Sequence, residues 1–99
     1  MRRSAAKGLG YLHWENVATE HLDNLQIQVL EALLKVSSDS EWVVRYGAIV
    51  GLEGLAKSLS PQLYPQTLQI QARLTEIAST DEEIAVRARS LLALKLKHG

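Results

Sequence analysis

A chain of 99 residues with 46% hydrophobic and 22% charged residues can bury one core but is too short for two independent domains. Lys and Arg number 11, as do Asp and Glu, so no excess of positive charge favours nucleic acid or an anionic membrane as a partner. The absence of cysteine excludes disulfides, thiolate metal sites and a cysteine nucleophile. No apolar run is long enough for a signal peptide or a membrane span, so we expect one cytoplasmic domain over residues 1–99.

The opening segment RRSAAKGLGYL predicts a helix from Arg2, with the apolar positions Ala5, Ala6, Leu9 and Leu12. This helix has the character of the second member of a helical hairpin, and the sequence has no room before it for the first. We therefore expect the C-terminal part of a longer array or one half of an assembly, with a divergent terminal cap as the alternative. The segment HWENVATE, which follows, predicts a loop.

A second helix is predicted over roughly residues 21–36, with an apolar stripe formed by Leu25, Val29, Leu33 and Val36. The short turn SSDS comes next, and Asp39 or Ser40 is a good N-cap for a third helix over residues 41–56. Acidic residues are expected in the first turn of that helix, where they complement the helix dipole.

The third predicted helix contains three glycines, although glycine in a helix interior is destabilising by roughly 0.5–1 kcal/mol relative to alanine. Ala48 and Gly51 fall on the apolar face at helical spacing, where small residues let neighbouring backbones approach closely. Gly47 and Gly54 do not share that reason as clearly. A shallow exposed groove is one interpretation for these two positions.

The segment SLSPQLYPQ, with both prolines, predicts a second loop. A fourth helix is expected over roughly residues 64–78, with Leu68, Ala72 and Ile77 as its stripe. Thr80 or Asp81 is the expected N-cap of a last helix that contains RARSLLALKLK.

Two internal matches relate these helices to one another. The string LQIQ occurs twice, 43 residues apart, and SSDSEWVVR matches STDEEIAVR at an offset of 42, which pairs Asp39 with Asp81 and Arg45 with Arg87. A period in the low forties with two helices per unit is typical of HEAT or armadillo repeats. We therefore predict an all-α, HEAT-like solenoid of helical hairpins, with about two and a half repeats.

The segment DSEWVVRYGAIVGLEGLA, with RRSAAKGLGYLHW before it and VRARSLLAL after it, resembles the HEAT-like repeats of phycobilisome lyases from cyanobacteria. Within that family it looks most like the E-type subunit of the phycocyanin alpha-subunit phycocyanobilin lyase. The resemblance implies a lyase or bilin-chaperone subunit that assists attachment of phycocyanobilin to a cysteine of a phycobiliprotein. It also implies a second, related lyase subunit as partner, and phycocyanobilin as a substrate and not as a permanently bound cofactor.

The same repeat class includes proteins that do no chemistry. A noncatalytic scaffold for protein–protein interaction, including a phycobilisome-disassembly adaptor, is therefore the alternative function. Bilin binding distinguishes the two, because a scaffold needs no free chromophore to bind a phycobiliprotein.

A bilin offers propionate groups to arginine and conjugated rings to aromatic side chains. Arg45, Trp42 and Tyr46 lie within about one helical turn of each other and are the first candidates for a ligand or partner contact. The structural alternative for Arg45 and Arg87 is a link between repeats, through an acidic residue or a helix-end carbonyl. For Trp42 the alternative is packing between repeats.

His13, Trp14 and Glu15 form the second candidate cluster, at the end of the first predicted helix. A histidine and a glutamate could exchange protons near neutral pH, or could bind a metal together with His21. A histidine at a helix end also interacts favourably with the helix dipole, and a partner contact is a third interpretation. No metal-binding spacing occurs in the chain, so we predict no metal site.

Overall fold

The computed structural model describes residues 19–97, and these residues contain helices and no strand. In chain order the elements are α2 (Thr19–Val36), α3 (Trp42–Ser58), the 3-10 turn η2 (Pro61–Leu63), α4 (Tyr64–Thr80) and α5 (Ile84–Lys97). The predicted all-α class is thus confirmed, and each helix lies close to its expected range. The helix expected from Arg2, which supplies the half repeat, lies outside the described residues, and the extent of the domain stays a prediction.

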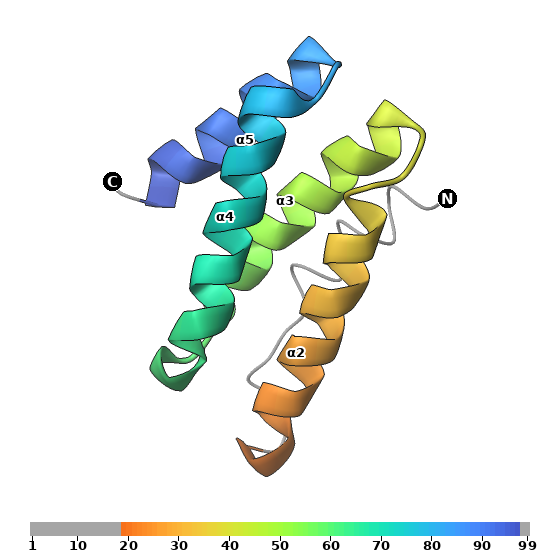
Figure 1. The fold of residues 1–99 in the computed structure, drawn as a ribbon. Helices are drawn as coiled ribbons and strands as arrows, with labels where there is room; N and C mark the ends of the chain where they lie inside the picture. Colours follow the sequence, from red (N-terminus) through yellow and green to blue (C-terminus); the bar gives the residue numbers. More distant parts are fainter. Residues whose placement is uncertain (1–18, 98–99) are drawn as a thin grey trace.

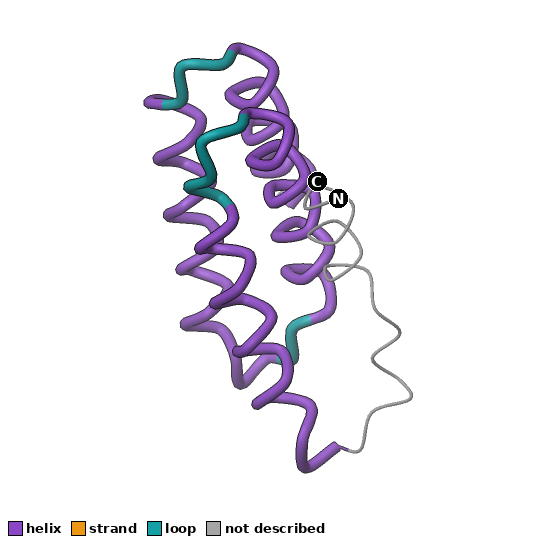
Figure 2. The backbone as a smooth tube through the Cα atoms, turned by 90° about the vertical axis from the view of Figure 1, so that its right-hand side faces the viewer, coloured by secondary structure: helices purple, strands orange, loops and turns teal. Residues whose placement is uncertain are grey.

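The four helices form two stacked hairpins, α2 with α3 and α4 with α5 (Figure 1). Helices α2 and α4 lie side by side in one layer, and α3 and α5 form the layer behind them (Figures 1 and 2). The core lies between the layers and is formed by Leu30, Leu33, Ile49, Leu52, Leu55, Ile70, Leu74, Ile77, Val86 and Ala93. Two-helix units that bury their faces by stacking are the HEAT-like arrangement that the repeat predicts.

Helix α3 is the most deeply buried of the described helices: it contacts α2, α4 and α5, and its residues 47–55 are all buried. All three of its glycines, Gly47, Gly51 and Gly54, are buried, as is Ala48. The packing role expected for Gly51 is confirmed, and the interpretation of Gly47 and Gly54 as an exposed groove is wrong. A helix with neighbours on several sides has small residues on more than one face.

The apolar stripes expected in the first helix of each hairpin are partly wrong. Leu25 is 39% exposed and Leu68 is 45% exposed, and both begin a copy of the string LQIQ. The two copies bury different letters, since Gln26 is buried in the first and Ile70 in the second. Gln26 is accommodated because its Nε2 atom donates a 3.2 Å hydrogen bond to the carbonyl oxygen of Ser58.

The second helix of each hairpin begins later than expected. Helix α3 starts at Trp42 and α5 at Ile84, with no acidic residue in the first turn of either. Asp39 and Asp81 therefore precede the helices instead of capping them directly. Each aspartate accepts a hydrogen bond from the backbone N–H two residues later, which is a turn motif that aspartate favours.

The two prolines also differ in their roles. Pro61 begins the 3-10 turn η2, whereas Pro65 lies in the first turn of α4 and not in a loop. Proline is tolerated there because the first N–H groups of a helix have no partner within the helix. None of the helices within residues 19–97 is long and apolar enough to cross a membrane.

Candidate functional site

The turn between the two helices has the same hydrogen-bonding motif in both hairpins. In the first copy, Asp39 Oδ1 accepts the Glu41 N–H at 2.9 Å, and Arg45 Nη1 donates to the Asp39 carbonyl at 3.0 Å. In the second, Asp81 Oδ1 accepts the Glu83 N–H at 2.9 Å, and Arg87 Nη1 donates to the Asp81 carbonyl at 2.6 Å. The aspartate shapes the turn, and the arginine six residues later closes it.

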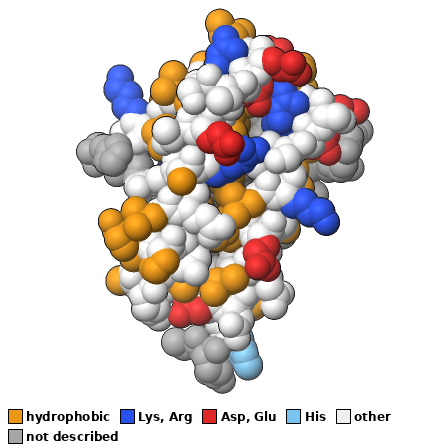
Figure 3. All heavy atoms as spheres, in the orientation of Figure 1, with side chains coloured by type: hydrophobic (Ala, Val, Ile, Leu, Met, Phe, Trp, Pro, Cys, Tyr) orange, Lys and Arg blue, Asp and Glu red, His pale blue; other side chains and the backbone are white. Residues whose placement is uncertain are grey.

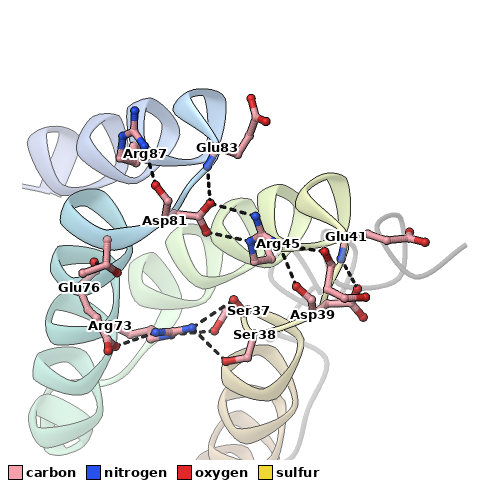
Figure 4. Close-up of polar contacts among 12 residues, drawn as sticks. Ser37, Ser38, Asp39, Glu41, Arg45, Arg73, Glu76, Asp81, Glu83 and Arg87 are labelled. Atoms are coloured by element: carbon pink, nitrogen blue, oxygen red, sulfur yellow. Dashed lines mark hydrogen bonds and ion pairs between the residues drawn. The ribbon is translucent and has the colours of Figure 1, made fainter.

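Arg45 also joins the two hairpins (Figure 4). Its Nε atom lies 2.8 Å from Asp81 Oδ2 and its Nη2 atom 3.0 Å from Asp81 Oδ1, while Nη1 also donates to the Ser40 carbonyl at 3.2 Å. The side chains of Arg45 and Asp81 are only 11% and 8% exposed. A two-point, nearly buried pair fixes both distance and orientation between the partners. These contacts correspond to the structural alternative for Arg45.

The same pair determines the protonation behaviour of Asp81. Burial acts most strongly and raises the pKa of this carboxyl, but the hydrogen bonds from Arg45 and from the Glu83 N–H, with the charges of Arg45 and Arg87, outweigh it. The pKa of Asp81 therefore lies below its usual value. The hydrogen bond to Asp81 raises the pKa of Arg45, against a smaller opposite effect of burial, so both groups are charged near neutral pH.

Arg73 of α4 makes a second link between the hairpins, and sequence analysis missed it. Its guanidinium reaches the end of α2, with Nε 2.9 Å from Ser37 Oγ, Nη2 3.1 Å from the Ser37 carbonyl and 3.0 Å from Ser38 Oγ (Figure 4). Its Nη1 atom pairs with Glu76 at 2.6 Å. The carbonyl groups at the end of a helix lack partners within the helix, so Arg73 acts as a cap supplied by the next repeat.

A third link joins the second helices of the hairpins. Arg89 Nη2 of α5 lies 2.7 Å from Glu53 Oε1 of α3, and the Glu53 side chain is only 6% exposed. A glutamate within the otherwise small and apolar stretch GLEGLA was a signal that could have found this pair, because buried carboxylates need a cationic partner.

These turns border an open hollow of about 340 Å³ between the two hairpins. Its lining residues are Ser37, Ser38, Asp39, Arg45, Arg73, Ile77, Thr80, Asp81 and Glu82. Acidic and basic side chains lie next to each other over the upper part of this face (Figure 3). Both arginines that line the hollow make ion pairs within the chain, so the hollow itself has no free guanidinium for an anionic ligand among these lining residues.

An aromatic pair stands at the start of α3. The rings of Trp42 and Tyr46 are 6.5 Å apart between centroids, at an interplanar angle of 82°, which is an edge-to-face contact. Trp42 is 43% exposed and Tyr46 is half-buried. Trp42 thus presents a large apolar surface to solvent while Tyr46 holds its ring in place.

The structure brings Trp42, Arg45 and Tyr46 together in the first turns of α3, as their spacing predicts. Of these three residues Trp42 is the most exposed, whereas Tyr46 is half-buried and the guanidinium of Arg45 is held by Asp81 and two carbonyls.

The candidates His13, Trp14 and Glu15 lie outside the described residues, and their roles stay predictions. His21 is exposed, near the start of α2. Over the part of the chain that the structure describes, no group of histidine, aspartate and glutamate side chains could hold a metal ion.

Comparison with known proteins finds several relatives over most of the chain, although no protein-family model matches it. One is a phycocyanobilin lyase subunit beta of Nostoc sp. PCC 7120, 47% identical over 93 residues, which are 94% of this chain and 44% of the relative. Another is the phycocyanin alpha phycocyanobilin lyase CpcF of Synechocystis sp. PCC 6803, 49% identical over 69 residues, which are 70% of this chain and 31% of the relative.

A solved structure agrees in fold. The complex of CpcE and CpcF of phycocyanin lyase from Nostoc sp. PCC 7120 matches with a TM-score of 0.83 at 46% sequence identity, over 93% of this chain and 51% of the matched one. Similarity at this level in both sequence and backbone extends over both hairpins.

The resemblance to phycobilisome lyases is confirmed, but the expected E type is wrong, since the similar proteins are named as beta subunits or CpcF. The repeat pattern reflects helix packing and turn geometry, so it identified the repeat family and could not by itself separate the two types. The chain spans less than half of the length of these relatives. By sequence and by fold, this chain is similar to part of the phycocyanobilin lyase subunits that are named as beta subunits or CpcF.

Proposed function

We propose that this chain is part of a bilin lyase subunit that assists the attachment of phycocyanobilin to a cysteine of a phycobiliprotein, together with a second lyase subunit. The observation that carries the proposal is the 47% identity to a phycocyanobilin lyase beta subunit over 94% of the chain. The match to the CpcE and CpcF complex supports the second subunit.

The chemistry expected of such a subunit agrees with the residues present. Thioether formation adds a thiol across a carbon–carbon double bond of the bilin, with the S–C bond formed at one carbon and a proton transferred to the conjugated system. No net oxidant or reductant is consumed. The sulfur comes from the acceptor protein, so a chain without cysteine is suited to holding the reactants and not to forming a covalent intermediate through sulfur.

Within the described residues, we assign bilin or acceptor contact to Trp42, with Tyr46 as its support. An exposed indole can stack on the conjugated rings of a bilin, and the edge-to-face contact with Tyr46 limits how the indole can turn. Arg45 contributes indirectly, because its contacts with Asp39 and Ser40 hold the turn from which Trp42 projects.

The test is a transfer reaction with purified components. This chain, the CpcE subunit of Nostoc sp. PCC 7120, phycocyanobilin and an apo-phycocyanin alpha subunit are mixed, and covalent bilin is detected by mass spectrometry of the denatured product. We expect adduct at a cysteine of the acceptor, formed faster and more uniformly than in mixtures that lack this chain. An identical rate and product pattern with and without the chain would contradict the proposal.

A second candidate is the noncatalytic scaffold. Its specific support is that Arg45, Arg73 and Arg89, which could have received the bilin propionates, all make ion pairs inside the fold. A scaffold binds assembled phycobiliprotein without free chromophore. Equal affinity for the apo and the bilin-carrying acceptor, with no effect on transfer, is the result that would favour it.

A further inference from the structure

Trp42 is exposed although the second hairpin is stacked next to the first. It is 43% exposed, and Ile84, which occupies the same place at the start of α5, is 70% exposed. Stacking of the second hairpin on the first therefore does not bury Trp42.

The backbone immediately before Trp42 is held by Arg45. Arg45 Nη1 donates to the Ser40 carbonyl at 3.2 Å and to the Asp39 carbonyl at 3.0 Å, two and three residues before Trp42. Within the same turn, Asp39 Oδ1 accepts the Glu41 N–H. Because Trp42 is the first residue of α3, the orientation of this turn decides where its indole lies.

The guanidinium of Arg45 is itself oriented by an aspartate of the second hairpin. Asp81 accepts from Arg45 Nε at 2.8 Å and from Nη2 at 3.0 Å, so the planar group is fixed along one edge while Nη1 meets the turn. Asp81 is anchored in its own turn, because its Oδ1 also accepts the Glu83 N–H at 2.9 Å. These contacts form one continuous path from Glu83 through Asp81 and Arg45 to Asp39 (Figure 4).

We propose that Asp81 is a positioning residue for Trp42: through Arg45, it holds the indole in the orientation in which it meets the bilin. The inference rests on the proposed function for the identity of the ligand. Asp81 lies in the other hairpin and its side chain is nearly buried, so it acts through the turn before α3 and not by contact with the ligand. The contact surface on the first hairpin is thus complete only when the second hairpin is stacked on it.

Glu53 provides a matched control. Like Asp81, it is a nearly buried carboxylate that pairs with an arginine of the other hairpin, in this case Arg89 at 2.7 Å. Glu53 lies on α3 about three turns beyond Trp42. Loss of either carboxylate weakens the stacking of the hairpins, but only loss of Asp81 releases the turn before Trp42.

The first measurement follows the free chain. With Trp14→Phe as background, Trp42 is the only tryptophan, so time-resolved fluorescence anisotropy reports its local motion alone. We expect the fast component of the decay to grow in Asp81→Asn and to stay unchanged in Glu53→Gln, with circular dichroism to verify that each variant is folded. Arg45→Gln should have the same effect as Asp81→Asn. The double variant should add little to it, because the aspartate acts through the arginine.

The second measurement is binding of phycocyanobilin to this chain in the presence of the CpcE subunit of Nostoc sp. PCC 7120. Asp81→Asn should weaken binding by roughly three- to tenfold, because a side chain that was held beforehand must now be immobilised on binding. Glu53→Gln should leave the affinity within about twofold of the original. Asp81→Glu should restore only part of the loss, since it keeps the charge but not the short side chain that bonds its own turn.

Unchanged motion of Trp42 in folded Asp81→Asn would overturn the positioning role. Equal changes in Asp81→Asn and Glu53→Gln would overturn it too, since a general loss of stability would then be the cause. If Asp81→Asn does not fold, Asp81→Glu takes its place in both measurements. Failure of the unmodified chain to bind bilin would count against the proposed function, whereas the motion of Trp42 in the free chain decides separately whether Asp81 positions it.

Discussion

Arg45 of α3 and Asp81, in the turn before α5, form a two-point ion pair that joins consecutive helical hairpins. The pair spans 36 residues, and so do the contacts of Arg73 with Ser37 and of Arg89 with Glu53. Each of the three contacts therefore joins a residue of the first hairpin to a residue of the second. Arginines at three positions thus set the distance between the hairpins.

The Arg45–Asp81 pair should contribute strongly to stability. Replacing Arg45 by Gln leaves a carboxylate that is only 8% exposed without its cation, so we expect the free energy of unfolding to fall by about 3 kcal/mol. Asp81→Asn should have a similar effect, and the double variant should lose much less than the sum. Urea unfolding of all four proteins measures this coupling. Additive losses would show that the interaction between Arg45 and Asp81 is not the cause of the lost stability.

A matched comparison comes from Glu76, which pairs with Arg73 on the same face of the molecule but is 60% exposed. Glu76→Gln should lower the free energy of unfolding by no more than about 0.5 kcal/mol, since exposed ion pairs contribute little. A loss as large as that of Asp81→Asn would mean that burial does not explain the difference.

The lowered pKa of Asp81 predicts a particular dependence of stability on pH. Below about pH 4, the unfolded chain takes up a proton at this aspartate more readily than the folded chain does. The contribution of Asp81 is therefore complete above that pH and is lost as the pH falls through the lowered pKa of the folded state. The free energy of unfolding of the original chain should exceed that of Asp81→Asn by a constant amount near neutral pH and by a shrinking amount in acid. A constant difference down to about pH 2 would contradict this.

The capping of α2 by Arg73 predicts unequal effects of two neighbouring serines. Ser37 is fully buried, donates to the Leu34 carbonyl at 2.6 Å and accepts from Arg73 Nε at 2.9 Å, whereas Ser38 is exposed. Ser37→Ala should lower the free energy of unfolding by about 1–3 kcal/mol, because the partly buried Nε donor of Arg73 loses its acceptor. Ser38→Ala should change it by less than about 0.5 kcal/mol. Thermal unfolding of the two variants tests this, and equal effects would contradict the capping role.

The fold could be predicted from sequence because the internal repeat is a strong constraint. The match of Asp39 with Asp81 and of Arg45 with Arg87 placed two turns in register, and the observed turns repeat the same hydrogen bonds. The positions at which α3 and α5 begin were predicted wrongly. An aspartate that accepts the N–H two residues later resembles an N-cap in sequence, so the helix starts were expected too early.

The candidate site was less predictable than the fold. Trp42, Arg45 and Tyr46 were found together from helical spacing, but spacing could not tell that the guanidinium of Arg45 turns toward Asp81. Arg73 was missed because its partners include a serine hydroxyl and a backbone carbonyl, and such partners leave no charge pattern in a sequence. The repeated string LQIQ misled for a related reason, since identical letters face different neighbours in α2 and α4.

Trp42 should matter for binding and little for stability, in contrast to the arginine network. Its side chain is 43% exposed, and its described aromatic contact is with the half-buried Tyr46. Trp42→Ala should lower the free energy of unfolding by at most about 1 kcal/mol, while it abolishes the stacking surface for a bilin. Urea unfolding checks the first part. A loss comparable to that of Arg45→Gln would make Trp42 a packing residue.

The most direct test of the proposed function is a titration of this chain with phycocyanobilin in the presence of CpcE from Nostoc sp. PCC 7120. Visible absorption and tryptophan emission are followed, with Trp42→Phe as the variant that separates Trp42 from Trp14. We predict a saturable shift of the bilin spectrum, with quenching that is largely lost in Trp42→Phe. An unchanged bilin spectrum at saturating chain and CpcE would contradict the account and favour the scaffold.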